Sequence, residues 1–81
     1  MNIAIKSYNL YAGQSSVSDY QLAYATILSV DRNGLGYDAD ATLTQTRGFK
    51  YTSSTGTLEF VVPAEGADDI TFELINVIYR V

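Results

Sequence analysis

One oxygen-rich cluster in the sequence has a spacing close to that of a metal-binding loop. Its four potential ligands are Asp31, Asn33, Asp38 and Asp40. Calcium loops use such alternating oxygen ligands, with a glycine at the sharp turn and a bidentate Glu at the twelfth position. Here Thr42 stands at the twelfth position and Leu35 at the fifth, so half of the expected ligands are missing. We therefore favour a hairpin with a polar tip and no metal, and keep calcium as the alternative.

Aromatic side chains offer a second possible chemistry, the stacking of rings on sugars. The chain has seven Tyr, three Phe and no Trp. Tyr20 and Tyr24 would share one face of a strand, and small β-domains host such binding sites. A sugar platform usually includes Trp, and Tyr suits a half-buried sheet face because its hydroxyl stays in water. We favour a core position for these two rings, with glycan binding as the alternative.

Catalytic chemistry is restricted by the residue types that the chain lacks. Without His or Cys it cannot build a serine-histidine triad, a cysteine nucleophile or the usual zinc sites. It has no glycine-rich phosphate loop, and acids such as Glu59 and Glu73 fall on strand positions that we expect to face solvent. We therefore predict that the protein is not an enzyme and uses no cofactor.

Charge and hydropathy exclude further classes of partner. The net charge is −4 and the five cations are scattered, so no basic stripe could neutralise phosphates or an anionic membrane. The first residues lack the pattern of a signal peptide, and no apolar run has the roughly 18 residues of a membrane span. We expect a protein made in the cytoplasm that binds neither nucleic acid nor membranes.

The elements that would position these residues are short strands. Apolar and polar residues alternate most clearly over residues 20–30, and Asn33-Gly34 follows as a strong hairpin signal. Further strand patterns cover residues 3–11, 35–46, 49–51, 57–62 and 70–81. Six or seven strands with turns every 8 to 12 residues predict one all-β domain over residues 1–81, an antiparallel sandwich or small barrel of immunoglobulin-like or jelly-roll-like type.

The strands at both ends of the chain carry apolar residues on two faces. In the last strand the alternation predicts a dry face formed by Ile70, Phe72 and Leu74. The apolar residues from Ile75 onward have the opposite parity, which requires a bulge, a central position in the sheet or cover by another subunit. A domain of 81 residues without disulfides has a thin core, so we expect a homo-oligomer. The predicted interface residues are Ile75, Val77, Tyr79 and Val81, followed by Ile3 and Ile5.

One pattern in the second half of the chain resembles a known group of proteins. The pattern consists of Phe49-x-Tyr51, Gly56-x-Leu58-x-Phe60 and Val77-x-Tyr79, preceded by Asn33-Gly34. It resembles small β-sandwich domains of tailed-phage head, tail and fibre proteins. The resemblance implies a structural subunit of a virion, a decoration, connector or fibre protein that packs on itself or on other structural proteins. It identifies no functional residues.

Two other functions remain open from the sequence. One is a small ligand-binding module that holds a glycan through Tyr rings or calcium through the loop of residues 31–40. The other is an intracellular adaptor or inhibitor that binds a single host protein.

Overall fold

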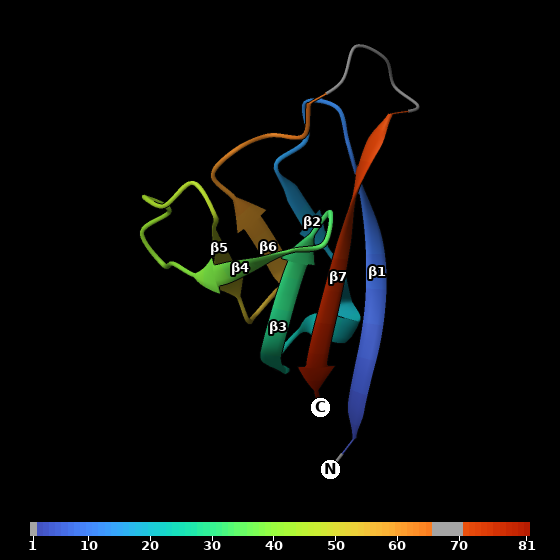
Figure 1. Ribbon diagram of the computed structural model, residues 1–81. Helices are drawn as coiled ribbons and strands as arrows, with labels where there is room; N and C mark the ends of the chain where they lie inside the picture. The colour runs from blue at the N-terminus through green and yellow to red at the C-terminus, as the bar shows by residue number, and fades with distance from the viewer. Residues whose placement is uncertain (1, 66–70) are drawn as a thin grey trace.

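The computed structural model describes residues 2–65 and 71–81, which form a sheet of seven strands (Figure 1). In chain order these are β1 (Ile3–Tyr11), β2 (Ser16–Ser18), β3 (Thr26–Arg32), β4 (Leu35–Ala39), β5 (Gly48–Thr52), β6 (Thr57–Phe60) and β7 (Phe72–Arg80). One 3₁₀ turn, η1 (Tyr20–Leu22), stands between β2 and β3. The expectation of an all-β fold is confirmed, and the sheet curls into a nearly closed, barrel-like shape.

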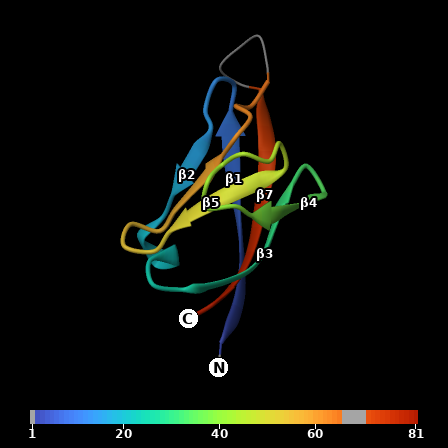
Figure 2. The same cartoon turned by 90° about the vertical axis from the view of Figure 1, so that its left-hand side faces the viewer.

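The sheet has the order β1-β7-β3-β4-β5-β6-β2 and is mostly antiparallel. The three longest strands, β1, β7 and β3, run side by side along the length of the molecule (Figures 1 and 2). The β3–β4 hairpin turns at Asn33 and Gly34, both with positive φ, as the sequence predicts. β4 then pairs in parallel with β5 and so joins the long strands to the other half of the sheet.

Side chains at the two ends of the strand order hold the barrel nearly closed. Asp19, which follows β2, accepts hydrogen bonds from Lys6 Nζ and the Tyr8 hydroxyl of β1, both at 2.8 Å. Lys6 lowers the pKa of Asp19 to about 2, and this carboxylate raises the pKa of Lys6 in return. The closure therefore relies on side chains, because no backbone ladder joins β1 to β2.

β7 lies at the centre of the long-stranded half, between β1 and β3. Its pairing with β1 is continuous from Tyr11↔Phe72 to Ile3↔Arg80, so the change of apolar parity involves no bulge in β7 or β1. Of the three explanations that the sequence leaves open, a bulge, a central position and cover by another subunit, the structure shows the central position. A central strand can carry apolar side chains on both faces, and the parity change marks only where the inward face becomes apolar.

The core is built from inward-facing side chains of almost every element. The largest fully buried ones are Leu10, Leu22, Val30, Leu58, Ile75 and Val77. Phe49, Phe60 and Tyr79 complete the centre of this cluster. Ile75, Val77 and Tyr79 therefore pack inside the protein, which corrects their prediction as interface residues. They turn inward because their neighbours Val30 and Leu10, on the two flanking strands, face the same interior.

The predicted strand over residues 20–30 is wrong in its first half. Asp19 caps η1 by accepting a hydrogen bond from the Gln21 N–H at 2.9 Å, and Tyr24 has a positive φ of 57°. Only Leu22 of this segment is fully buried, whereas Tyr20 and Tyr24 are 82% and 79% exposed. The expected core position of these two rings is therefore also wrong.

Candidate functional site

The most distinctive surface of the protein is the solvent-facing side of β1, β7 and β3, here called the outer face. Side chains of alternating residues on β1 and β7 point to it, as their exposure pattern records. Its exposed apolar members include Ile3, Ile5, Phe72 and Leu74, with Ile3 at 60% and Ile5 at 68% exposure. Isolated exposed apolar residues are common, but several on one sheet face are typical of a contact surface.

Two apolar areas lie on the outer face, separated by polar side chains. At one end Ile5 stands opposite Ile78, and at the other Tyr11 and Phe72 contact edge to face with ring centroids 5.7 Å apart. Between them the Ser7 hydroxyl donates a hydrogen bond of 2.6 Å to Asn76 Oδ1. In the area around Ile5 the apolar side chains of β1 and β7 lie next to each other, because Ile5 pairs with Ile78.

The structure divides the predicted interface residues into two groups. Ile3, Ile5 and Val81 are exposed, and their role as contact residues stays a prediction. The other three lie in the core, as described above. The sequence pattern also missed Phe72 and Leu74, which it placed on the dry face of the last strand, although the structure exposes them. Ile70, predicted on the same dry face, lies outside the described residues.

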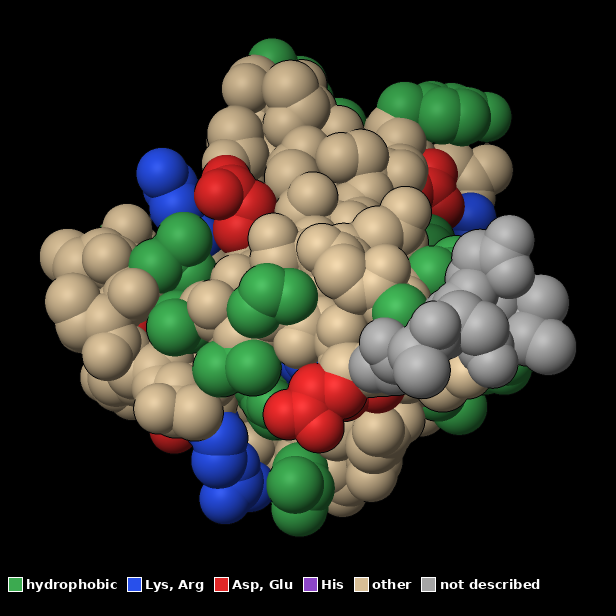
Figure 3. All heavy atoms as spheres, turned by 90° about the horizontal axis from the view of Figure 1, so that it is seen from above, with side chains coloured by type: hydrophobic (Ala, Val, Ile, Leu, Met, Phe, Trp, Pro, Cys, Tyr) green, Lys and Arg blue, Asp and Glu red, His purple; other side chains and the backbone are tan. Residues whose placement is uncertain are grey.

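A second candidate is an open pocket of about 410 Å³ beside the start of β7. Its lining includes Arg32, Tyr37, Val62, Pro63, Phe72 and Glu73. Figure 3 views the protein from this end, and the described part of that surface mixes acidic, basic and hydrophobic side chains. A ligand for this pocket would have to interact with Arg32 and Glu73, so their partners decide what it can bind.

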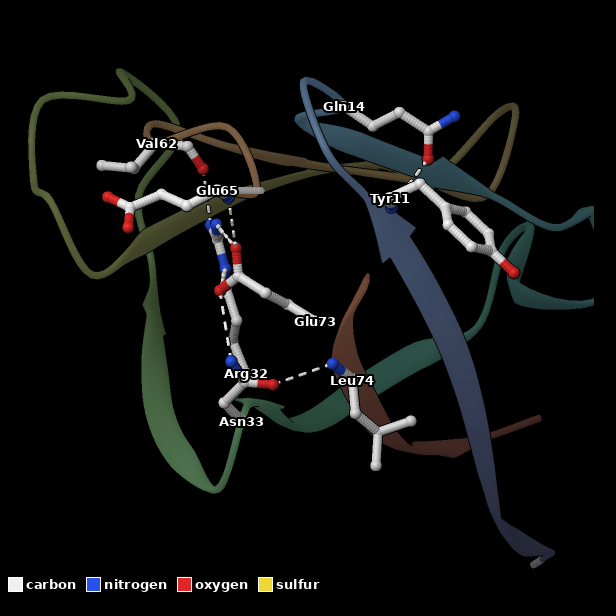
Figure 4. A network of polar contacts seen from close by, with 8 residues as sticks. All are labelled: Tyr11, Gln14, Arg32, Asn33, Val62, Glu65, Glu73 and Leu74. Carbon is white, nitrogen blue, oxygen red and sulfur yellow. Dashed lines mark hydrogen bonds and ion pairs between the residues drawn. The ribbon is translucent and has the colours of Figure 1, made fainter. Parts of the chain in front are cut away.

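The buried Arg32 forms a two-pronged ion pair with the partly buried Glu73 (Figure 4). Arg32 Nε lies 3.0 Å from Glu73 Oε1 and Nη2 lies 2.9 Å from Oε2, while Nη1 donates to the Val62 carbonyl at 2.6 Å. The guanidinium carbon is also 5.4 Å from the Phe60 ring centre, within cation–π range. Glu73 accepts a further hydrogen bond from the Glu65 N–H at 3.0 Å.

These contacts show that the pair holds the fold together. The Arg32 guanidinium keeps the pKa of Glu73 below its ordinary value, so the carboxylate stays ionised at neutral pH. All three guanidinium nitrogens donate within the protein. The pair therefore ties β3 and β7 to the segment around Val62, and it leaves no buried charge for a ligand to neutralise.

The four calcium candidates do not form a cluster. Asp31 lies on β3 and Asp38 on β4, while Asn33 Oδ1 accepts from the Leu74 N–H at 2.9 Å. Asp40 accepts from the N–H groups of residues 42, 44 and 45, and these bonds lower its pKa to about 2. Among the described residues no three His, Cys, Asp or Glu side chains come together to hold a metal ion. The spacing of the four residues reflects a hairpin and a loop cap.

A third candidate is the pair of exposed rings at Tyr20 and Tyr24. The backbone beneath them is fixed by the Tyr51 hydroxyl, which donates to the Leu22 carbonyl and accepts from the Ala25 N–H at 3.1 Å. The Tyr24 N–H donates to the Ser53 carbonyl at 2.9 Å. A tyrosine at positive φ is unusual, and strain of this kind persists only where the surroundings enforce it.

Comparison with known proteins adds no constraint on these candidates. None of the helical structure in the described residues is long and apolar enough to cross a membrane. No protein-family model, no curated protein and no solved structure matches the chain.

Proposed function

We propose that the protein is a non-enzymatic structural subunit that assembles with copies of itself through the outer face. The observation that carries the proposal is the exposure of Ile3 and Ile5 beside Ile78 on one regular sheet surface. Burying an isoleucine side chain contributes about 1.5–3 kcal/mol, and a thin-cored domain without cysteine gains from such cover. The resemblance to virion β-domains supports a decoration, connector or fibre subunit, which would also pack on other structural proteins.

Charge favours a second copy over a strongly charged partner. The charged residues that the strand registers place on the outer face are Arg80 and Asp31, which have opposite signs. Two identical faces can therefore meet without an excess of like charge. A partner with a highly basic or acidic surface would find no complementary patch there.

The finer fold type, immunoglobulin-like or jelly-roll-like, stays a prediction.

The test is the native mass of the protein and of Ile5→Lys, measured by light scattering over a concentration series. We expect wild-type protein to be oligomeric and Ile5→Lys to raise the dissociation constant by about tenfold or more, because each copy would place a charge in an apolar contact. Leu35→Lys is the matched control, since Leu35 is exposed on β4, away from the outer face.

Circular dichroism of both variants keeps the result interpretable. Both side chains are largely exposed, so both proteins should retain the wild-type spectrum and melting behaviour as monomers. Wild-type protein that stays monomeric at high micromolar concentration contradicts the proposal. Equal weakening by the two lysines would show that net charge, and not the outer face, controls association.

A second candidate function, glycan binding, is favoured by the exposure of Tyr20 and Tyr24. Two rings held in solvent on a fixed backbone are suited to stacking on sugar faces, and neither stabilises the core. We expect a matching oligosaccharide to raise the melting temperature, with a shift that grows with the logarithm of its concentration once the site is largely occupied. Tyr24→Gly should abolish the shift, while its own stability should not fall, because Gly relieves the positive φ. Absence of a shift across a broad glycan panel rejects this candidate.

A further inference from the structure

β1 is an edge strand, because no described strand pairs with one of its two long edges. It stands at one end of the strand order, and β7 is its only partner among the described strands. In both ribbon views the N-terminal end of β1 lies at the same end of the molecule as the C-terminus, beside the end of β7 (Figures 1 and 2). Edge strands of this length are usually protected by charge, proline or cover, because their free backbone groups bind other strands.

The hydrogen bonds at the two ends of the β1–β7 ladder identify which residues face the free edge. Val81 donates to the Asn2 carbonyl, and Ala12 donates to the Thr71 carbonyl, both at 3.3 Å. Backbone groups alternate sides along an antiparallel strand. The even-numbered residues of β1 therefore bond to β7, and the odd-numbered ones point away from it.

Tyr11 verifies this alternation independently. It is odd-numbered, and its N–H donates to Gln14 Oε1 at 3.0 Å while its carbonyl accepts from the Gln14 N–H at 2.9 Å. Gln14 thus caps the edge at the end of β1. The other odd-numbered residues are Ile3, Ile5, Ser7 and Asn9, and no hydrogen bond from the described part of the chain reaches their backbone groups.

The side chains along this edge do nothing to repel another strand. The odd-numbered residues place their side chains on the outer face, and all of them are uncharged. The only charged residue of β1 is Lys6, whose ammonium group is held by Asp19 and Gln21 on the other side of the sheet. The free edge is therefore apolar or neutral from Ile3 to Asn9.

We propose that two copies of the chain pair antiparallel through these edges, about a two-fold axis at Ile5, into one continuous sheet. The inference rests on the proposed self-assembly and adds an edge-to-edge contact, through the β1 backbone, beside the outer-face contact. Identical strands related by a two-fold axis are self-complementary, so one unpaired edge satisfies the other. Each copy would use Ile3, Ile5 and Ser7, making about six new backbone hydrogen bonds in all.

The register follows from the side chains that each alternative brings together. With Ile5 opposite Ile5, the existing Ile5↔Ile78 pair becomes a row of four isoleucines across four strands. A two-fold axis at Lys6 would place two lysines opposite each other at the closest strand spacing. An axis at Ser7 would place Ile3 opposite Tyr11, whose backbone groups Gln14 already occupies.

Single-cysteine variants test this register, because the chain has no cysteine of its own. Under mild oxidation we expect Ile5→Cys to give roughly tenfold more disulfide-linked dimer than Ser7→Cys, since two facing Cα atoms at about 5.5 Å suit a disulfide. An equal mixture of Ile3→Cys and Ser7→Cys should cross-link between the two variants. This mixture keeps the test valid if Ile5→Cys fails to fold.

Amide hydrogen exchange of the wild-type protein gives a second measurement without any substitution. The amides of Ile3, Ile5 and Ser7 should be protected at high concentration and should lose that protection, by about tenfold or more, on dilution to monomer. Even-numbered amides of β1 should stay protected in both states. An oligomer without these patterns overturns the register but leaves the proposed function standing, whereas a monomeric wild-type protein overturns both.

Discussion

Glu73→Ala should destabilise the protein by about 3–5 kcal/mol, because it leaves the buried Arg32 charge without its partner. The substitution removes both carboxylate contacts at 3.0 and 2.9 Å and the acceptor of the Glu65 N–H. A domain of this size has a total stability of only about 4–12 kcal/mol. Urea unfolding followed by circular dichroism should therefore show a midpoint close to, or below, the lowest denaturant concentration.

Two further variants separate the ion pair from the loss of a strand glutamate. Glu59→Ala, on β6, should change the free energy of unfolding by no more than about 0.5 kcal/mol. Arg32→Met combined with Glu73→Leu should be more stable than Glu73→Ala alone, because an apolar pair needs no compensation for buried charge. If Glu73→Ala behaves like Glu59→Ala, the ion pair does not hold β3 and β7 together.

The difference in stability between wild-type protein and Glu73→Ala should depend on pH in a definite direction. Arg32 lowers the pKa of Glu73 in the folded protein, so the unfolded chain takes up protons first as the pH falls. The ion pair contributes fully to the free energy of unfolding above the pKa of Glu73 in the unfolded chain, about 4.3. This contribution is lost as the pH falls through the lower pKa of Glu73 in the folded protein. Wild-type protein and Glu73→Ala should therefore converge in stability only in acid.

Gly56→Ala should be the most damaging conservative substitution, with an expected loss of about 2–5 kcal/mol. A Cβ atom at this position would lie 2.1 Å from the Asp19 carbonyl oxygen and 2.8 Å from the Ala23 nitrogen. Both atoms belong to the backbone around η1, which Tyr51 fixes in place, so neither can move cheaply. The positive φ of 67° adds the ordinary penalty for alanine in the left-handed region.

Gly34→Ala is the matched control for the steric part of this effect. Gly34 also has a positive φ, 82°, but nothing lies within 4 Å of the Cβ position. It should lose only the conformational penalty of about 1–2 kcal/mol. The difference between the two variants in urea unfolding measures the packing of residues 19–23 against Gly56, and equal losses would show that this segment is loosely held.

The sequence predicts the elements of this fold better than the faces of its strands. The Asn33-Gly34 hairpin follows from local rules of turn geometry, and side-chain parity limits the last strand to a bulge, a central position or cover by another subunit. These rules do not predict which side of β7 turns inward, because both sides are apolar. The choice depends on Val30 and Leu10, which join β7 only through pairings distant in the sequence.

Two other misjudged features have the same origin. Residues 20–24 alternate like a strand, but the capping of η1 by Asp19 and the Asp19 N–H bond to the Gly56 carbonyl fix a different conformation. The sequence predicts a solvent-facing Glu73, but its carboxylate binds the buried Arg32, 41 residues earlier in the chain. Contacts between distant segments override local pattern at both places, and the exposed rings and the buried ion pair result from them.

The position of β7 between β1 and β3 also decides how the chain must fold. The first strand cannot complete its ladder with β7 until nearly the whole sequence has been synthesised, since Tyr11 pairs with Phe72 and Ile3 with Arg80. Pairings this remote carry a large loop-closure cost and slow the rate-limiting step. Without β7, β1 and β3 would each present an unpaired edge to other chains. With β7 between them, the described strands keep one open edge on this side, that of β1.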